Sequence, residues 1–334
     1  MANGHLVVTG AAGFIGSHLS RRLRAEGLRV VGIDSLASPT PASLIERRLE
    51  ELGRDPGFDL VELDLNETSP ESLLKNADAI FHLAGRPGVR DSNERLLWRH
   101  NVAATRALLE AAERGGVTDL VFASSSSIYG RGGERRPCHE DDRPEPISAY
   151  GRSKLAAESL LRRSSLNTRV LRLFTVYGPQ QRSDMAFARF LDSALSQRPT
   201  PLFQGVEAER DFTYVEDAVE GVLRAWRRVR QGTYNLSGGM RVPLRAPLAI
   251  LSKLVGAPVV LEAAVAPPEP NATEADLSRA RATLDYEPRT PLRIGLREQA
   301  LDAFAQFRAH PIAGQDTPKA DYAGMEQENI RPPA

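Results

Sequence analysis

The sequence predicts an α/β protein, with a doubly wound parallel sheet followed by a smaller, mixed α/β region. Short apolar runs alternate with amphipathic segments through the first half of the chain, and a glycine-rich turn joins the first run to the first of these segments. Beyond residue 175, strand-like runs become sparse while Pro and Arg become frequent. The alternation favours a parallel sheet with helices on both of its faces.

The individual elements follow from this pattern. The strand candidates of the first half are residues 5–9, 29–33, 58–63, 78–84, 119–124 and 168–174. Residues 14–27 and 101–116 are typical of amphipathic helices, and the second ends in Gly115-Gly116, a plausible C-terminal cap. In the second half the strand candidates are 210–215, 232–237 and 257–262.

The change of pattern also sets the expected domain boundaries. We expect a first domain over residues 1–174, to which a segment near 212–238 returns, and a second region over 175–310. Residues 311–334 are polar, Pro-rich and aperiodic, which predicts a poorly ordered tail.

Composition narrows the function classes. The 334 residues carry 43 Lys+Arg and 43 Asp+Glu, so the net charge is zero and a general polyanion binder is disfavoured, nucleic-acid binders included. Cys138 is the one cysteine, which excludes an internal disulfide framework and fits a reducing cytoplasm. We expect no signal peptide, no membrane span and no metal site.

The turn "TGAAGFIG" places Gly10, Gly13 and Gly16 between the first predicted strand and the first predicted helix. Glycines there permit a tight turn, let the backbone approach a pyrophosphate and let the helix pack on the strand. The helix N-terminus then faces the anion. The sequence therefore predicts a Rossmann dinucleotide-binding domain.

The residues after the next strands complete the expected cofactor site. Asp34 ends the second strand, where a carboxylate accepts both ribose hydroxyls and repels a 2′-phosphate, so we expect NAD rather than NADP. Asp64 and Leu65 follow the third strand and are placed to flank the adenine. The fourth strand ends in "LAG", residues 83–85, which we expect to line the cofactor.

A candidate general base lies further along the chain. In "AYGRSK", Tyr150 and Lys154 are four residues apart and share one face of a helix. A Lys ammonium and a positively charged nicotinamide both favour the phenolate form of the Tyr. Such a Tyr can act as a base near neutral pH.

These motifs resemble a known family. "TGAAGFIG", "SSSSIYG", "YGRSK", "FTVYGP" and "RDFTYVEDAV" together look like an extended short-chain dehydrogenase/reductase of the NAD-dependent sugar epimerase/dehydratase type, over residues 5–308. The resemblance implies tightly held NAD, a nucleotide-diphosphate sugar bound between two domains, and a catalytic hydroxyl at Ser125, four residues before Tyr129. The cofactor-binding set we predict is Gly10, Gly13, Phe14, Ile15, Gly16, Asp34, Asp64, Leu65, Leu83, Ala84, Gly85, Asn101, Ser124, Tyr150 and Lys154.

The residues after Ser125 bear on the reaction. The family's 4,6-dehydratases carry Asp-Glu at these positions, and its decarboxylases carry Glu at the second, whereas this chain has Ser126 and Ser127. Hydroxyls position a sugar but are poor acids and bases without an activating partner. Elimination is therefore disfavoured, and reversible oxidation at the sugar C4 is favoured.

The remaining resemblance concerns the substrate. "TVYGPQQRSDMA" is similar to the corresponding segment of UDP-glucuronate 4-epimerases and implies a carboxylate clamp at Arg182, supported by Thr175 and by the two serines. It also implies diphosphate binding by Arg210, uracil contacts from Phe203 and Gln204, and a substrate contact from Arg90. Relatives carry a further diphosphate Arg that "APPEPNATEADLSRA" lacks, so this contact is missing or is supplied from elsewhere.

We therefore expect C4 epimerisation of UDP-glucuronate to UDP-galacturonate by a cytoplasmic homodimer, paired through helices around 92–115 and 149–163. The Ala/Arg-rich composition and the glucuronate signature suggest an actinobacterial antibiotic pathway, such as moenomycin assembly. Three alternatives stay open: a 4-epimerase of a neutral UDP-hexose or UDP-N-acetylhexosamine, a decarboxylase or dehydratase, and a non-catalytic NAD-binding sensor.

Overall fold

The computed structural model describes residues 4–37, 40–88, 93–265 and 269–309, and these form two compact units. Unit 1 comprises Met1–Val176, Arg210–Arg241 and Ala266–Arg289, and unit 2 comprises Tyr177–Glu209, Val242–Val265 and Thr290–Ala334. Of the region expected over 175–310, the described residues 269–289 thus belong to unit 1. The predicted tail lies outside the described residues.

Unit 1 is built on a seven-stranded sheet, which confirms the predicted fold class. The strands run in the order β11-β6-β5-β4-β1-β2-β3, and every pairing in this sheet is parallel. Their bounds are β1 (His5–Thr9), β2 (Val30–Asp34), β3 (Phe58–Glu62), β4 (Ala77–His82), β5 (Asp119–Ser125), β6 (Asn167–Leu173) and β11 (Gly232–Leu236). The predicted strand at 232–237 therefore forms an edge of the main sheet.

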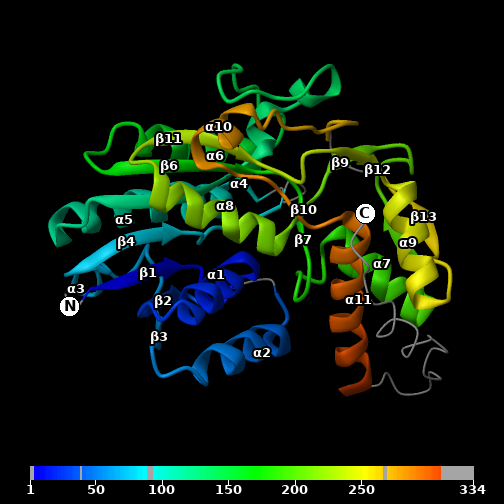
Figure 1. The fold of residues 1–334 in the computed structure, drawn as a ribbon, viewed down its shortest axis with the longest axis horizontal. Coiled ribbons are helices and arrows are strands. Elements are labelled where there is room, and N and C mark those ends of the chain that lie inside the picture. Colours follow the sequence, from blue (N-terminus) through cyan, green and yellow to red (C-terminus); the bar gives the residue numbers. More distant parts are fainter. Residues whose placement is uncertain (1–3, 38–39, 89–92, 266–268, 310–334) are drawn as a thin grey trace. The chain divides into compact units, whose positions relative to one another are not determined.

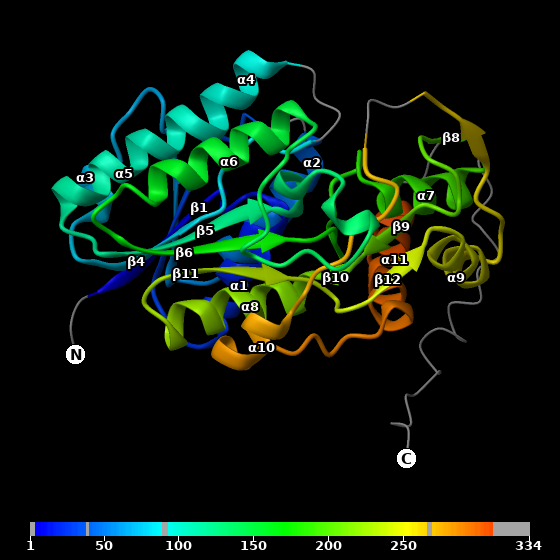
Figure 2. The same ribbon diagram turned by 90° about the horizontal axis from the view of Figure 1, so that it is seen from above.

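Helices cover both faces of this sheet (Figures 1 and 2). One face carries α1 (Phe14–Ala25), α2 (Ala42–Gly53), α8 (Val215–Arg228) and α10 (Ser278–Leu284). The other carries α3 (Glu71–Leu74), α4 (Glu94–Trp98), α5 (Ala104–Gly115) and α6 (Ala149–Leu161). The central strands β1, β4 and β5 are therefore covered on two sides, which explains their largely apolar runs, whereas the edge strand β3 keeps Asp59 and Glu62 exposed.

Successive side chains of a strand point to opposite faces of the sheet, so each strand contributes to two separate layers of the core. Leu6 and Val8 of β1 pack under α1 and α8, whereas Val7 between them packs under α5 and α6. In β5, Val121 belongs to the first layer and Phe122 to the second. The same alternation directs the next residues of β5, including Ser124, toward one helix layer or the other.

The order of the strands reverses between β1 and β4, the position at which doubly wound sheets bind ligands. Gly10 follows β1 with φ +74° and sits against the end of β4, since a Cβ there would come within 2.7 Å of the Ala84 nitrogen. A Cβ on Gly16 would lie 2.0 Å from the Gly10 carbonyl oxygen. Glycine at both positions therefore lets the turn close tightly and lets α1 start directly behind it.

The predicted helix over 101–116 is present but begins irregularly. Residues Arg99–Ala103 form a π-helical turn, η1, that continues into α5. Gly116 ends α5 in the left-handed conformation, with φ +77°, which confirms the predicted cap. Two 3₁₀ turns, η2 (Ser126–Tyr129) and η3 (Gly132–Glu134), follow β5.

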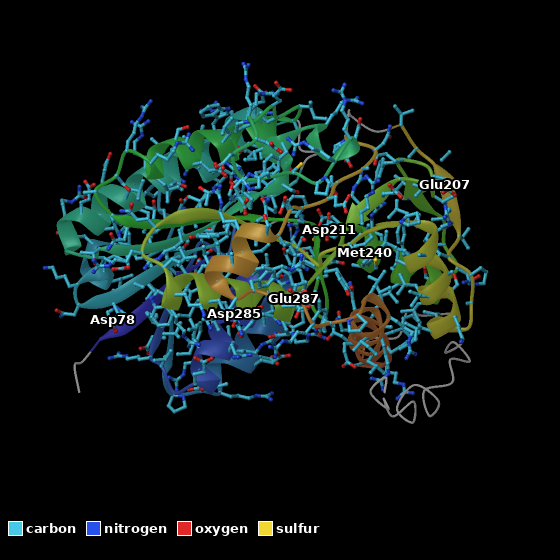
Figure 3. The ribbon with its side chains drawn as sticks, turned by 45° about the horizontal axis from the view of Figure 1, so that its top comes forward. Asp78, Glu207, Asp211, Met240, Asp285 and Glu287 are labelled. Carbon is cyan, nitrogen blue, oxygen red and sulfur yellow. The ribbon has the colours of Figure 1, made fainter. Side chains whose placement is uncertain are left out.

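The charged surface of unit 1 is tied together by ion pairs. Asp285, labelled in Figure 3, follows α10 and accepts from Arg224 at 2.8 Å and from Arg228 at 3.2 Å, both on α8. Such exposed pairs contribute little to stability individually. The main stabilisation of unit 1 therefore comes from its two apolar layers.

The described residues of unit 2 form α7 (Ala186–Ser196), α9 (Arg245–Val255) and α11 (Leu292–Ala309), which pack on one another. Strand β8 (Thr200–Leu202) pairs in parallel with β13 (Leu261–Ala263), so the strand predicted over 257–262 begins only at its end. The strand predicted over 210–215 is split at buried Phe212 into β9 (Glu209–Asp211) and β10 (Thr213–Tyr214). The remaining short strands are β7 (Val176–Tyr177) and β12 (Arg241–Pro243).

Candidate active site

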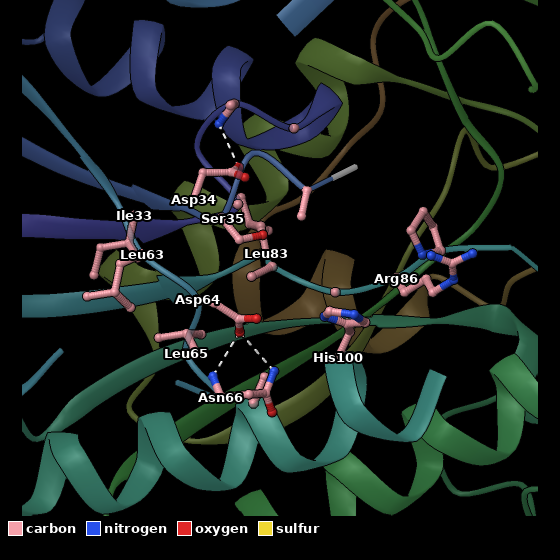
Figure 4. Close-up of a pocket in the computed structure, with 18 of the residues that line it drawn as sticks. Ile33, Asp34, Ser35, Leu63, Asp64, Leu65, Asn66, Leu83, Arg86 and His100 are labelled. Carbon is pink, nitrogen blue, oxygen red and sulfur yellow. Dashed lines mark hydrogen bonds between the residues drawn. The ribbon is translucent and has the colours of Figure 1, made fainter. Parts of the chain in front are cut away.

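A pocket lies in unit 1 at the carboxyl ends of β1, β2, β3 and β4 (Figure 4). Eight of the predicted cofactor residues line it: Gly10, Gly13, Asp34, Asp64, Leu65, Leu83, Ala84 and Gly85. Apolar walls with a few carboxylates and exposed glycine backbone suit an adenine nucleotide with its ribose and diphosphate. The residues present therefore fit NAD.

Asp34 joins the glycine turn to the loop after β2. Its Oδ2 accepts from the Ala12 N–H at 3.0 Å and its Oδ1 from the Leu36 N–H at 2.9 Å. The buried guanidinium of Arg48 donates to the Ala12 carbonyl at 2.9 Å, so the turn is braced from two sides. Burial raises the pKa of Asp34, while these N–H groups and Arg48 oppose the rise.

Asp64 lies across the pocket from Asp34 (Figure 4). Its Oδ1 accepts from the backbone N–H and the side-chain amide of Asn66, at 2.8 Å and 3.0 Å, and its Oδ2 accepts from Arg99. Burial alone would raise the pKa of Asp64, but the hydrogen bonds from Asn66 and Arg99 outweigh it and the pKa is lowered. Asp64 therefore shapes the loop and stays charged.

The side chains of three predicted cofactor residues, Phe14, Ile15 and Ser124, are directed elsewhere. Phe14 is buried in the core of unit 1, edge-to-face on His18 at 5.7 Å between ring centroids, and Ile15 packs against the same core. Their backbone begins α1, so only their N–H groups are available to a diphosphate. Ser124 is also buried, and its hydroxyl donates to Glu158 at 2.5 Å.

The predicted catalytic pair lies on α6, as expected. Ser148 caps this helix by accepting from the Gly151 N–H at 3.0 Å. Tyr150 is half-buried in the first turn. One turn later, Lys154 is buried, donates to the Ala123 carbonyl at 2.9 Å and lies over the Phe122 ring at 4.8 Å. Burial lowers the pKa of Lys154 to about 8, although Glu158 opposes the shift.

Asn101 and Gly85 enclose the Lys154 ammonium. A Cβ on Gly85 would lie 2.8 Å from the Asn101 Oδ1 and 3.3 Å from the Lys154 Nζ. Asn101 accepts from the Arg86 N–H at 2.7 Å and donates to the Arg86 carbonyl at 3.0 Å and to Ser153 at 2.9 Å. Its buried amide thus ties the loop after β4, which lines the pocket, to α6.

The serines that follow Ser124 remain near the strand end. Ser125 ends β5, accepts from the Ser127 N–H at 3.2 Å and donates to the Ser127 hydroxyl at 3.1 Å. Ser126 and Ser127 are half-buried in η2. This edge therefore offers hydroxyls next to the helix that carries Tyr150.

The nearby His82 is a packing residue. It is fully buried at the end of β4, and its two ring nitrogens lie 2.7 Å from the Thr9 hydroxyl and 2.9 Å from the Thr105 hydroxyl. Burial, with Lys154 adding to it, lowers the pKa of His82 to about 3. The ring therefore stays neutral at physiological pH.

The predicted substrate residues are divided between the units. In unit 1, Thr175 is half-buried and accepts from the Thr213 N–H at 3.0 Å through its carbonyl. Arg210 contacts Glu269 at 3.6 Å and donates to the Asn271 carbonyl at 3.1 Å. Arg90 lies outside the residues that the structure describes.

In unit 2, Arg182 makes a two-pronged ion pair with Asp184. Its Nε donates to Oδ1 and its terminal nitrogen to Oδ2, both at 2.9 Å. The Arg189 guanidinium stacks over the Phe203 ring at 5.1 Å, and Gln204 is half-buried beside it in sequence. The Arg182 fork is thus of the kind that binds a carboxylate, and here that carboxylate is Asp184.

Sequence reasoning missed part of the pocket lining. Asn66, Arg86 and His100 also line the pocket. The missed signal is the π-turn that carries His100 and Asn101, a geometry frequent at functional sites but not evident from residue types. Cys138 is buried and burial raises its pKa to about 12, so this thiol stays protonated at neutral pH.

The described residues offer neither a metal-binding cluster nor a membrane-spanning helix. No group of three or more His, Cys, Asp or Glu side chains among them is arranged to hold a metal ion. None of the helices in this part of the chain is long and apolar enough to cross a membrane.

Asp34→Asn is expected to weaken NAD binding at least tenfold and to narrow the preference for NAD over NADP, because it removes the anion that holds the ribose and repels a 2′-phosphate. Titration calorimetry of both nucleotides into nucleotide-free protein measures the change. Asp59→Asn is the control, since Asp59 is an exposed ion-paired carboxylate on β3. An unchanged ratio of the two affinities would exclude Asp34 as the selecting group.

Lys154→Met is expected to change how stability depends on pH. The pKa of Lys154 is lowered from 10.5 to about 8 in the folded protein, so between these values the unfolded chain binds more protons. This group's contribution to the free energy of unfolding therefore rises with pH, by at most about 3 kcal/mol. Urea unfolding of nucleotide-free wild type and variant from pH 7 to 10.5 measures the difference, and a difference that is constant with pH contradicts the burial of a charged Lys154.

The comparisons with known proteins agree with this geometry. The chain matches the NAD dependent epimerase/dehydratase family over residues 6–237. It is 36% identical to an uncharacterized UDP-glucose epimerase, YtcB, of Bacillus subtilis (88% of this chain, 96% of the relative) and 34% identical to a UDP-glucuronate 4-epimerase of Thermodesulfobacterium geofontis (88% and 94%). The solved UDP-glucuronic acid 4-epimerase of Bacillus cereus, in complex with UDP-glucuronic acid and NAD, is similar with a TM-score of 0.86 at 33% identity, covering 90% of this chain and 99% of that one. The chain belongs to the NAD-dependent epimerase/dehydratase family.

Proposed function

We propose that this protein is a UDP-sugar 4-epimerase that interconverts UDP-glucuronate and UDP-galacturonate. The observation that carries the reaction type is the end of β5, where hydroxyls follow Ser125 and no carboxylate stands in residues 124–127. Elimination or decarboxylation would need an acid or base there. Reversible oxidation at C4 needs a base, a hydroxyl and NAD.

The proposed roles follow from the chemistry of the side chains. Bound NAD supplies a two-electron acceptor that later returns the electrons to C4. Tyr150 takes the proton of the C4 hydroxyl, and the Lys154 ammonium favours its phenolate form. Ser125 donates a hydrogen bond to the C4 oxygen, and the sugar turns before reduction on its opposite face.

Arg182 is the residue on which the choice of glucuronate rests. A guanidinium fork matches a carboxylate in two parallel hydrogen bonds. The 4-keto sugar has its carboxylate β to the ketone and is prone to lose carbon dioxide. We propose that Arg182, with Thr175, Ser126 and Ser127, holds that carboxylate where its breaking bond cannot align with the ketone.

A neutral UDP-hexose is the second candidate, and one contact favours it. The Nε and one terminal nitrogen of Arg182 already bind Asp184, so a substrate carboxylate has to displace Asp184 or use the remaining nitrogen. The relation to a UDP-glucose epimerase supports the same alternative.

We further propose a cytoplasmic homodimer, a place in antibiotic biosynthesis, diphosphate binding by Arg210 and uracil binding by Phe203 and Gln204.

Chromatographic assays of purified protein with UDP-glucuronate, UDP-glucose and UDP-N-acetylglucosamine test the proposal. UDP-galacturonate is the expected product, with kcat/KM at least 100-fold above that for either neutral sugar, the upper range of a charged hydrogen-bonded contact. If kcat/KM is higher for a neutral UDP-sugar than for UDP-glucuronate, that neutral UDP-sugar is the substrate and the glucuronate assignment is wrong. No turnover of any of them would favour a non-catalytic sensor.

Two variants with opposite expected effects test the clamp. Arg182→Ala should raise KM for UDP-glucuronate about tenfold or more, because it removes charge-assisted hydrogen bonds, and should increase the fraction of 4-keto-pentose product. Asp184→Asn should lower KM, because it frees the fork. KM for UDP-glucose serves as the internal control. If Arg182→Ala leaves KM for UDP-glucuronate unchanged, Arg182 does not bind the substrate carboxylate.

A further inference from the structure

One buried carboxylate near the proposed catalytic residues is not used by this mechanism. The Glu158 side chain is 0% exposed on α6. A buried carboxylate is costly unless it is paired and hydrogen-bonded, so its contacts indicate what it does.

Both oxygens of Glu158 are occupied. The Ser124 hydroxyl donates to Oε1 at 2.5 Å, and Arg172 of β6 donates to Oε1 at 3.1 Å and to Oε2 at 2.9 Å. Arg172 is itself buried and also donates to the Tyr129 hydroxyl at 2.9 Å. The carboxylate is therefore held rigidly between three elements of unit 1: α6, β5 and β6.

The spacing along α6 relates Glu158 to the reaction. Tyr150, Lys154 and Glu158 are successive members of one helix face, four residues apart. Lys154 donates to the carbonyl of Ala123, and Glu158 accepts from the hydroxyl of the next residue, Ser124. Two links to adjacent residues of β5 fix the helix against the strand, and Ser125 comes directly after them.

Glu158 also acts on the charge of Lys154. The groups that face Lys154 are Glu158 on α6 and His82 on β4, together with the Phe122 ring on β5. Burial keeps His82 neutral, and burial lowers the pKa of Lys154 while Glu158 raises it. Glu158 itself is faced by Arg172, by Ser124 and by Arg162, the last at 3.6 Å.

We infer that Glu158 is a positioning residue that holds the end of β5 in register with α6 and keeps Lys154 in its ammonium form. The inference rests on the roles proposed above for Tyr150, Lys154 and Ser125. A purely structural ion pair between Glu158 and Arg172 is the competing explanation. The two differ in what happens to proton affinities when only the charge of Glu158 is removed.

Glu158→Gln keeps the shape and an acceptor for Ser124 but removes the charge. The ammonium of Lys154 then loses its anion, its proton leaves at lower pH, and the phenolate of Tyr150 loses support. We expect kcat at pH 7 to fall at least tenfold with KM changed less than threefold. The pH–rate profile should narrow, because its basic limb should move to lower pH and its acidic limb to higher pH.

Ser124→Ala is the matched control, because it removes one hydrogen bond to Glu158 and leaves the charge in place. It should lower kcat without moving either limb of the profile. If both limbs of the pH–rate profile of Glu158→Gln stay where they are in the wild type, whatever the kcat, Glu158 is only a structural ion-pair partner and the inference is wrong.

Loss of the charge leaves Arg172 buried without its anion, which is strongly destabilising. The double variant Glu158→Gln/Arg172→Met removes both charges together and provides a second protein in which the same shift of the limbs is expected. Unchanged limbs in the double variant overturn the inference equally.

A measurement without substrate separates this inference from the proposed function. Ultraviolet difference titration of NAD-bound protein, with and without Tyr150→Phe, gives the pKa of Tyr150 alone. Glu158→Gln should raise that pKa even if no UDP-sugar is turned over. An unchanged pKa of Tyr150 contradicts the inference, whereas a shifted pKa in a protein inert toward every UDP-sugar contradicts only the proposed function.

Discussion

The buried ammonium of Lys154 imposes the strictest condition on the catalytic part of unit 1. A charge removed from water needs a carbonyl, a π face or a carboxylate around it, and Lys154 has the Ala123 carbonyl, the Phe122 ring and the field of Glu158. Each of these comes from β5 or α6, so meeting the needs of one side chain also fixes the helix on the strand. The fold and the site are therefore stabilised by the same contacts.

The pocket proposed for the cofactor lies at the carboxyl ends of β1, β2, β3 and β4. Gly10 and Gly16 allow the first turn to close against β4, and Asp34 and Arg48 hold that turn through Ala12. Gly85 leaves room for the Asn101 amide and the Lys154 ammonium. In the proposed reaction the hydride leaves C4 and Tyr150 takes the proton from the oxygen on that carbon, so the cofactor and the Tyr base must both lie close to C4.

Much of this arrangement was predictable, because the governing patterns are local. The apolar runs gave six strands of the main sheet, and the glycine turn and Asp34 gave the cofactor pocket. Ser124 is predicted to bind the cofactor, but its side chain was not predictable from local pattern and turns to Glu158. It follows the parity of Phe122 toward the α5 and α6 layer, where Glu158 binds it. Arg172 within the apolar run "VLRLF" was the available signal, because a charge inside a buried strand requires a buried partner. The pairing of Arg182 with Asp184 depends on loop conformation and has no comparable signal in the sequence.

In the proposed reaction, the electrons removed from C4 return to C4. Turnover of UDP-glucuronate deuterated at C4, followed by NMR of the product, measures this directly. We expect UDP-galacturonate with the deuterium retained at C4, and no label entering from heavy water when unlabelled substrate is used. Loss of the C4 deuterium to solvent, or formation of a product without the C4 hydrogen, would contradict it.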